Sequence, residues 1–346
     1  MQGCSNVKRL VALIFVVTLV AAFPLFAGGE KEAAGEMEFE KRTWRIGLIS
    51  ADGHALTRAC RRMSEIVKEK TDGQVVIEVV PGGALGGEVE LQDMVSVGSL
   101  QMCSIGTGIP PSFNPEFNIL NMPYLWDSQQ QMIDFANSDI QEEMNEKYRE
   151  ASGIKIVASN YDQGIRHTLA KKVIDEPSDF DGVKIRVPQL PAWVDMWKAI
   201  GANPTPIPFP EVYTALQQGV VDAMECPLYW IYASSFYEQA KNLILTGHVM
   251  YYNQIMINDK LYQGLPDKLK TILTEAALEA GEYETELTRQ QEAELRQKME
   301  DEGVQFIEID RDAVSEMISP VYDKWEDKFG REIREKIEEF KANWQG

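Results

Sequence analysis

Histidine is scarce in this sequence, and the motifs that surround catalytic residues in common enzyme families are missing. Three histidines occur among 346 residues, and none belongs to an HExxH pair that would hold a catalytic zinc ion. The chain also lacks the GxSxG segment of many hydrolases and a GxGxxG segment that would bind a dinucleotide. We therefore expect a protein that is not an enzyme, with no catalytic residues, no metal ion and no cofactor.

Basic residues are outnumbered by acidic ones. Lysine and arginine together number 34, against 54 aspartates and glutamates, which gives a formal net charge of −20. Nucleic-acid backbones are bound through a basic face, so a nucleic-acid partner is excluded. Any anionic ligand of this chain must be attracted by a local positive site.

Cysteine is rare and shows no regular spacing. Of the four cysteines, Cys4 lies near the N-terminus, whereas Cys60, Cys103 and Cys226 are far apart. Three widely spaced cysteines do not form the disulfide framework of a small secreted protein. We expect them to be small buried residues.

Long apolar runs are absent except near the N-terminus. Lys8 and Arg9 precede the run "LVALIFVVTLVAA", and small residues follow Pro24. This order is typical of a secretory signal peptide, and the run is too short to span a bilayer. We predict that residues 1–27 are cleaved, the alternative being an uncleaved anchor. The mature protein would be soluble and periplasmic, with no direct membrane insertion, and its charge would be −22 because two basic and no acidic residues are lost.

The remaining chain alternates between strand and helix patterns. Residues 28–42 are charged and poor in apolar residues, which predicts a flexible leader. After it, "TWRIGLIS" and "QVVIEVV" have the pattern of strands on either side of an amphipathic helix, and similar cycles follow. This succession predicts an α/β fold.

Three longer segments have distinct patterns. A single helix is predicted over residues 128–148, and a long alternating strand over residues 248–258 is a natural crossover between two lobes. The strand pattern restarts near Gly164, which suggests the start of a second lobe. One helix of unusual length is predicted from Pro266 to about Glu302.

Two arginines lie in strand-like segments of this acidic chain. Arg166 is in "YDQGIRHTLA" and Arg186 is in "DGVKIRVP", 20 residues later. Two strands of one sheet could bring both guanidinium groups to a common edge, where each matches a carboxylate with two parallel hydrogen bonds. The alternative is that each arginine points to solvent or pairs with a nearby aspartate.

Aromatic residues near these arginines allow two interpretations. Trp193 and Trp230 either pack in the core or line a cleft. Phe209, which lies between prolines in "PIPFPEVYTAL", is either a staple at the start of a helix or a pocket wall. The residues alone leave both alternatives open.

Long stretches of the sequence resemble one known family. The segments "TDGQVVIEVVPGGALGGEVELQDMVSVGSL", "DFDGVKIRVP", "GANPTPIPFPEVYTALQQGVVDAMECP" and "FYEQAKNLILTGHV" are similar to the DctP-type solute-binding proteins of TRAP (tripartite ATP-independent periplasmic) transporters. The resemblance covers nearly the whole mature chain. It implies a two-lobed periplasmic-binding-protein-like fold with an interlobe cleft, crossover strands and a long connecting helix.

The resemblance also implies boundaries for the lobes. Lobe 1 would comprise residues 43–163 plus 252–291, and lobe 2 would comprise residues 164–251 plus 292–346. An organic acid would bind in the cleft between them.

The family pattern implies the ligand-binding residues. Arg186 would form the salt bridge with the ligand carboxylate, Arg166 would assist it, and Phe209 would pack on the ligand. Cys226 stands where the family usually has an asparagine, so this chain has a weak thiol donor there. Glu88 is at a position that can face the polar end of the ligand, although an acid at a helix N-terminus is equally explained by the helix dipole.

A further departure concerns ligand identity. The sialic-acid-binding branch uses an acidic side chain after the strand "QMCSIG", where this chain has Gly106, which disfavours sialic acid. The resemblance implies capture of a carboxylate and its delivery to a sodium-coupled TRAP permease in the membrane. The alternatives are a binding protein that serves a sensor kinase and a periplasmic enzyme on the same fold.

Overall fold

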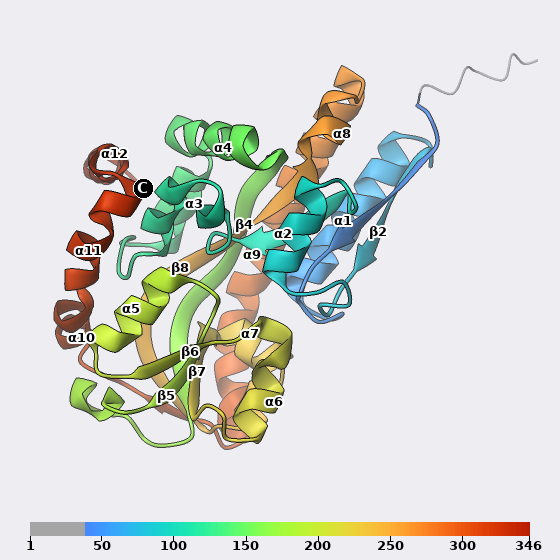
Figure 1. Ribbon diagram of the computed structural model, residues 1–346. Coiled ribbons are helices and arrows are strands. Elements are labelled where there is room, and N and C mark those ends of the chain that lie inside the picture. The colour runs from blue at the N-terminus through green and yellow to red at the C-terminus, as the bar shows by residue number, and fades with distance from the viewer. Residues whose placement is uncertain (1–38) are drawn as a thin grey trace, which may run out of the picture. The chain divides into compact units, whose positions relative to one another are not determined.

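The computed structural model describes residues 39–346 (Figure 1). The predicted signal peptide and most of the predicted leader lie outside these residues. Phe39 is buried, and the first strand begins at Arg42, so the last residues of the predicted leader, 39–42, belong to the fold. None of the helices in residues 39–346 is both long enough and apolar enough to cross a membrane.

The described residues form one mixed sheet whose strands follow the order β2-β1-β3-β8-β4-β7-β5-β6, with β9 paired to β8. The strands are β1 (Arg42–Gly47), β2 (Val75–Val80), β3 (Met102–Gly106), β4 (Ile154–Ala170), β5 (Lys184–Val187), β6 (Asn203–Pro206), β7 (Ala223–Pro227), β8 (Asn242–Asn258) and β9 (Gln305–Ile307). At one end of the sheet, β2, β1 and β3 are parallel to one another, and β3 pairs antiparallel with β8. At the other end, β7, β5 and β6 are parallel, and β7 pairs antiparallel with β4.

The two central strands are much longer than the others. Strands β4 and β8 have 17 residues each and run antiparallel through the middle of the sheet in Figure 1. The sequence pattern had suggested a restart near Gly164, but β4 continues through it. The ladder has register shifts around this point, and Gly164 adopts φ +90°, a conformation that glycine accepts without strain.

Helices follow most strands. They are α1 (Ala55–Lys70), α2 (Glu88–Ser96), α3 (Gln129–Ala136), α4 (Asp139–Ser152), α5 (Pro191–Ala199), α6 (Val212–Gln217), α7 (Leu228–Ala233), α8 (Asp259–Gln263), α9 (Asp267–Asp301), α10 (Arg311–Ile318), α11 (Pro320–Phe329) and α12 (Arg331–Asn343). The predicted α/β fold and the predicted long helix, α9, are confirmed.

The helix predicted over residues 128–148 is wrong, because the structure has two helices there. The first, α3, ends at Ala136, and Ser138 then caps the second, α4, by accepting a hydrogen bond from the Gln141 backbone N–H. A serine cap satisfies an otherwise free helix N–H group, which explains why a new helix begins at this point.

The long helix α9 packs against β4 and α1. The Tyr161 hydroxyl on β4 donates a hydrogen bond of 2.7 Å to the Ala277 carbonyl on α9. Gly281 faces Asn160, and a Cβ at Gly281 would overlap the Asn160 side chain. A residue without a side chain is therefore needed for the close approach of helix and strand.

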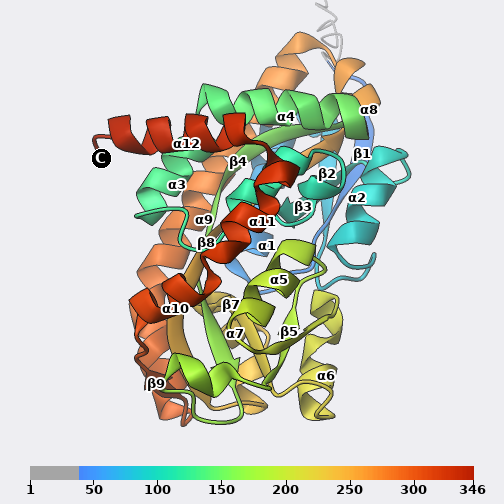
Figure 2. The same cartoon turned by 60° about the vertical axis from the view of Figure 1, so that its left-hand side comes forward.

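The C-terminal helices return toward the first half of the chain (Figure 2). Helix α11 packs on α5 and on residues 115–121, and α12 also contacts residues 115–121. Lys336 on α12 forms an ion pair of 2.8 Å with Glu143 on α4. These helices thus contact elements from both predicted lobes, and the assignment of residues 292–346 to lobe 2 stays a prediction.

Replacing Gly281 by alanine should destabilise the protein even though alanine favours helices by about 1 kcal/mol. Overpacking costs about 1 to 3 kcal/mol, and the change would also displace Asn160 Nδ2 from the Leu278 carbonyl, now 2.9 Å away. We expect Gly281→Ala to lower the free energy of unfolding in urea by about 1 kcal/mol. In an Asn160→Ala background the same change should be neutral or stabilising, and an equal loss there would contradict the packing explanation.

Candidate ligand-binding site

The candidate residues gather where the parallel strands end. Arg186 lies near the carboxyl end of β5, Cys226 lies near that of β7, and Phe209 follows β6. Glu88 begins the helix after β2, and Gly106 ends β3. Ligands of α/β proteins bind at the carboxyl ends of strands, because loops and helix N-termini converge there.

The loops from the two ends of the sheet touch each other at this edge. A Cβ at Gly83, after β2, would lie 2.8 Å from the Pro210 side chain, and one at Gly87 would lie 3.7 Å from that of Pro208. Gly83 adopts φ +68° as well, so both the backbone and the available space require glycine there. The loop after β2 and the loop after β6 are therefore in contact beside the candidate residues.

Arg186 is a buried cation with few partners. Its side chain is 2% exposed, and its Nε donates a hydrogen bond of 2.8 Å to the Ile207 carbonyl. The two terminal nitrogens make no hydrogen bond or ion pair with another of residues 39–346. Burial lowers the pKa of Arg186 to about 10, against the opposing effect of Glu225. The Phe209 ring centre lies 5.9 Å from the guanidinium carbon.

Arg166, in contrast, is paired within the protein. Its Nε donates to Glu225 Oε2 at 2.6 Å, and its Nη2 donates to Glu225 Oε1 at 3.0 Å and to the Glu225 carbonyl at 3.1 Å. The guanidinium carbon lies 4.7 Å from the Trp193 ring centre and 4.9 Å from that of Tyr251. Arg166 is therefore held in a fixed position by an ion pair and two aromatic rings.

Glu225, the partner of Arg166, was not predicted from the sequence. Strands β4 and β7 pair antiparallel with Arg166 opposite Pro227, so Glu225, two residues earlier, projects from the same face of the sheet. The two residues are 59 positions apart in the chain. The available signal was the acidic residue next to Cys226, but strand pairing was needed to interpret it.

His248 completes this buried group. Its Nε2 lies 3.2 Å from Glu225 Oε2, and its Nδ1 lies 2.8 Å from the Thr246 hydroxyl. Burial lowers the pKa of His248 although Glu225 acts to raise it, so the imidazole is neutral at pH 7 and its Nε2–H donates to Glu225. Burial alone would raise the pKa of Glu225, but Arg166 and His248 hold it below its ordinary value.

Cys226 and Glu88 lie within electrostatic reach of both arginines. Burial raises the pKa of the Cys226 thiol to about 12 against the effect of Arg166 and Arg186, so the thiol is neutral. Burial also raises the pKa of Glu88, whereas Arg186, Arg166 and a 2.9 Å hydrogen bond from the Gly106 N–H oppose this shift. The structure thus brings the five predicted residues into one group.

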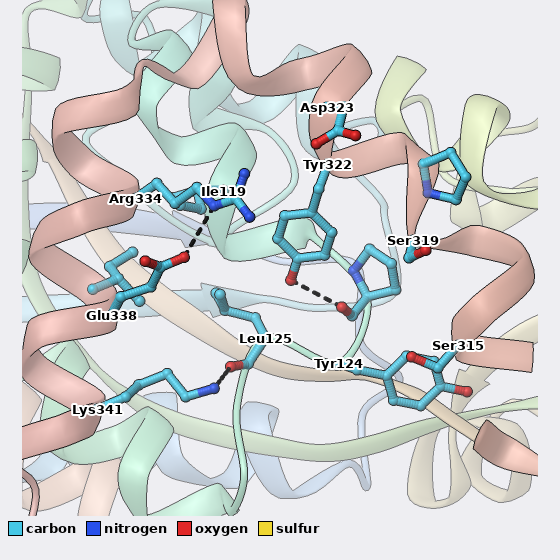
Figure 3. A pocket seen from close by; sticks show the side chains of 13 residues that line it. Ile119, Tyr124, Leu125, Ser315, Ser319, Tyr322, Asp323, Arg334, Glu338 and Lys341 are labelled. Atoms are coloured by element: carbon cyan, nitrogen blue, oxygen red, sulfur yellow. Dashed lines mark hydrogen bonds and ion pairs between the residues drawn. The ribbon is translucent and has the colours of Figure 1, made fainter.

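Other parts of the described chain offer weaker sites. A cavity of about 490 Å³ lies between residues 119–125 and the C-terminal helices (Figure 3). Its cations already have partners, since Arg334 donates to Glu338 at 3.0 Å and Lys341 donates to the Leu125 carbonyl at 2.6 Å. Within residues 39–346, no group of three or more histidine, cysteine, aspartate or glutamate side chains is arranged to hold a metal ion.

The sheet has a parallel group of strands at each end, and the long strands β4 and β8 join the two groups. A buried arginine lies where the parallel strands end. This is the architecture of a solute-binding protein. Residues 46–328 match the sequence profile of the bacterial extracellular solute-binding proteins of family 7. The chain belongs to this family, the DctP family of TRAP solute-binding proteins, and the resemblance found in the sequence is confirmed. Members of the family are binding proteins, and the chain is accordingly not an enzyme.

Individual relatives agree with this assignment. A solute-binding protein of Roseobacter denitrificans is 31% identical over 90% of this chain and 91% of its own length. The crystal structure of a TRAP periplasmic solute-binding protein from that organism with bound L-galactonate has a TM-score of 0.82 and 30% identity, and covers 87% of this chain and 99% of its own.

A second crystal structure gives the same result. It is a TRAP periplasmic solute-binding protein from Xanthobacter autotrophicus with bound β-D-galacturonate. Its TM-score is 0.82 at 28% identity, and the match covers 86% of this chain and 99% of the other. Both bound molecules are sugar acids.

Replacing Glu225 by glutamine keeps the shape of the side chain but removes the charge that pairs with Arg166. Breaking a buried ion pair while one partner stays charged costs about 3 to 5 kcal/mol. We expect Glu225→Gln to lower the free energy of unfolding at pH 7 by about this amount, as measured by urea denaturation with tryptophan fluorescence.

The pH dependence of this loss tests its electrostatic origin. The pKa of Glu225 is lower in the folded chain than its ordinary value, so its charge stabilises the fold at pH values above about 4.3. That contribution disappears as the pH falls from there through the folded pKa. The difference between wild type and Glu225→Gln should therefore shrink in acid, and a difference that persists unchanged to pH 3 would argue against the ion pair.

Proposed function

We propose that this protein captures an organic acid through a salt bridge between Arg186 and the ligand carboxylate. The observation that carries the proposal is an arginine, Arg186, that is 2% exposed and whose terminal nitrogens have no partner among residues 39–346. Burying a cation without an anion is unfavourable, and a bidentate carboxylate would supply the missing charge and the missing hydrogen-bond acceptors. The ligand thereby offsets a cost already present in the unliganded protein.

The other residues have supporting roles in this proposal. Arg166, already neutralised by Glu225, contributes its remaining N–H groups and holds the neighbouring aromatic rings. Phe209 packs against the ligand beside Arg186, and Glu88 accepts hydrogen bonds at its polar end. Cys226 leaves room next to both arginines without adding a strong donor.

Ligand entry requires movement, because the arginines are nearly inaccessible in this conformation. We propose that the two predicted lobes separate about the long strands β4 and β8 to admit the ligand, and close again over it. Closure excludes water and strengthens the ion pair. An affinity in the micromolar range corresponds to about −8.2 kcal/mol, which charge-assisted hydrogen bonds and apolar burial can provide.

The ligand class follows from the relatives. Two structures with more than 25% identity hold L-galactonate and β-D-galacturonate, so we propose a sugar acid for this chain. Gly106, in place of an acidic residue, distinguishes the site from the sialic-acid-binding pattern, and Cys226 stands in place of the asparagine usual in the family.

The proposed partner is a membrane permease. TRAP binding proteins work with membrane permeases, and we propose that this chain delivers its ligand to a sodium-coupled one. The N-terminal 27 residues would direct it to the periplasm and be removed.

Replacing Arg186 by methionine should abolish ligand binding without weakening the fold. Methionine fills a similar volume without a charge, so the free energy of unfolding of the unliganded protein should stay the same or rise. In wild type, galactonate or galacturonate at 100 times Kd should stabilise by about 2.7 kcal/mol, and Arg186→Met should lose this stabilisation in a thermal-shift assay. Arg331→Met, at a side chain that is 78% exposed, is the control. Retained stabilisation in Arg186→Met would overturn the proposal.

Replacing Cys226 by asparagine should leave the binding of simple carboxylates intact or tighten it. An added neutral hydrogen bond contributes about 0.5 to 1.5 kcal/mol, which is up to about tenfold in Kd. Calorimetric titration with Cys226→Asn and Cys226→Ala separates the two effects, because alanine removes the thiol without adding an amide. A complete loss of binding in both variants would show that the thiol itself is needed.

A further inference from the structure

Three buried polar side chains near the candidate site have hydrogen-bonding atoms without partners. They are His54 at Nε2, Ser104 at Oγ, and Asn253 at both atoms of its amide. Each is at most 1% exposed. Buried polar groups in folded proteins are normally satisfied, so these unsatisfied groups indicate missing partners.

Asn253 and Ser104 lie on neighbouring strands and face the same way. Asn253 on β8 is directly opposite Gly106 on β3, and Ser104, two residues before Gly106, is its diagonal neighbour. Tyr251 shares this face of β8, and its hydroxyl occupies the space where a Cβ of Gly106 would lie. Asn253 therefore lies on the same face of β8 as Tyr251, whose ring contacts Arg166.

Gly106 connects this pair to the charged residues. Its backbone N–H donates to Glu88 at 2.9 Å, and the pKa of Glu88 responds to Arg186 and Arg166. Asn253 and Ser104 thus lie next to Gly106, whose backbone N–H binds Glu88. All three residues belong to β3 or β8.

His54 is linked to Phe209 through the Trp230 ring. It caps α1 by accepting a 3.1 Å hydrogen bond from the Leu56 N–H at Nδ1, so the hydrogen of the neutral ring is on Nε2. The ring lies 4.2 Å from the Trp230 ring centre, and Trp230 in turn lies 5.0 Å from Phe209. The Nε2–H of His54 is therefore an unused hydrogen-bond donor in a fixed position. Only the Trp230 ring separates His54 from Phe209, which lies beside Arg186.

These groups have the chemistry that a hydroxyl group needs. A hydroxyl accepts from the His54 Nε2–H and from the Asn253 amide N–H, and it donates to the amide oxygen or to Ser104 Oγ. The side chains are uncharged in this arrangement, since burial lowers the pKa of His54 to about 3. They would therefore contribute nothing to an ion pair with a second carboxylate.

We propose that His54, Ser104 and Asn253 bind the hydroxyl groups of the ligand, so that the site selects a polyhydroxy acid over an aliphatic acid of equal length. This inference rests on the proposed capture of a carboxylate by Arg186, which anchors one end of the ligand while the three polar residues recognise the rest. A site built to hydrogen-bond a hydroxyl discriminates strongly against an analogue without it, because its own polar groups are then left unpaired.

The test compares galactonate with hexanoate, which has the same chain length and no hydroxyl groups. Asn253→Leu replaces the amide with an apolar side chain of nearly the same shape. We expect Kd for galactonate to rise at least about tenfold, Kd for hexanoate to stay the same or fall, and the Tm of the unliganded protein to stay the same or rise. His54→Asn keeps a side-chain acceptor that can cap α1. It should reduce the preference for galactonate over hexanoate without lowering Tm.

Gln254→Met is the matched control, because Gln254 is the next residue of β8 and points to the opposite face. It should leave the ratio of the two affinities unchanged. An unchanged affinity for galactonate in both Asn253→Leu and His54→Asn would overturn the inference while the role of Arg186 stands, and it would mean that water molecules satisfy these groups. An equal loss for both acids would also overturn it. If wild type binds neither acid, nor galacturonate, the proposed function fails first.

Discussion

The ion pair between Arg166 and Glu225 organises the candidate site. It is buried, it links the long strand β4 to β7, and it is extended by His248 on β8. A buried pair of this kind tolerates no loss of one partner, so it fixes the relative positions of three strands where they meet. The Trp193 and Tyr251 rings pack against the same guanidinium group and take their positions from it.

The same pair leaves Arg186 as the uncompensated cation of the group. Glu225 is shared between Arg166 and His248, and the Glu88 carboxylate accepts from the Gly106 backbone. Arg186 retains one hydrogen bond to a carbonyl. In a chain with a net charge of −20, this arrangement concentrates a local positive charge at a buried arginine, which an acid can reach once the proposed lobes separate.

Much of the architecture could be predicted from local patterns. The alternation of strands and helices and the length of α9 follow from periodicity, whereas the site roles of Arg186, Phe209 and Glu88 were implied by the resemblance to the family. The wrong predictions concern places where the pattern of apolar residues does not show whether a helix or strand ends. Ser138 caps a second helix inside what looked like one, and Gly164 lies within β4 where a break had been expected.

The amino-acid sequence by itself determined the fold class, the family and the arginines, because strand and helix periods and long motifs are properties of neighbouring residues. Tertiary structure alone decided that Arg166 pairs with Glu225 while Arg186 does not pair, since this depends on the register of β4 against β7. It also decided that His54 Nε2, Ser104 Oγ and both amide atoms of Asn253 are buried without hydrogen-bond partners. Hydrogen-bond satisfaction is a relation between residues far apart in the chain, so it is defined only once the strands and helices have packed.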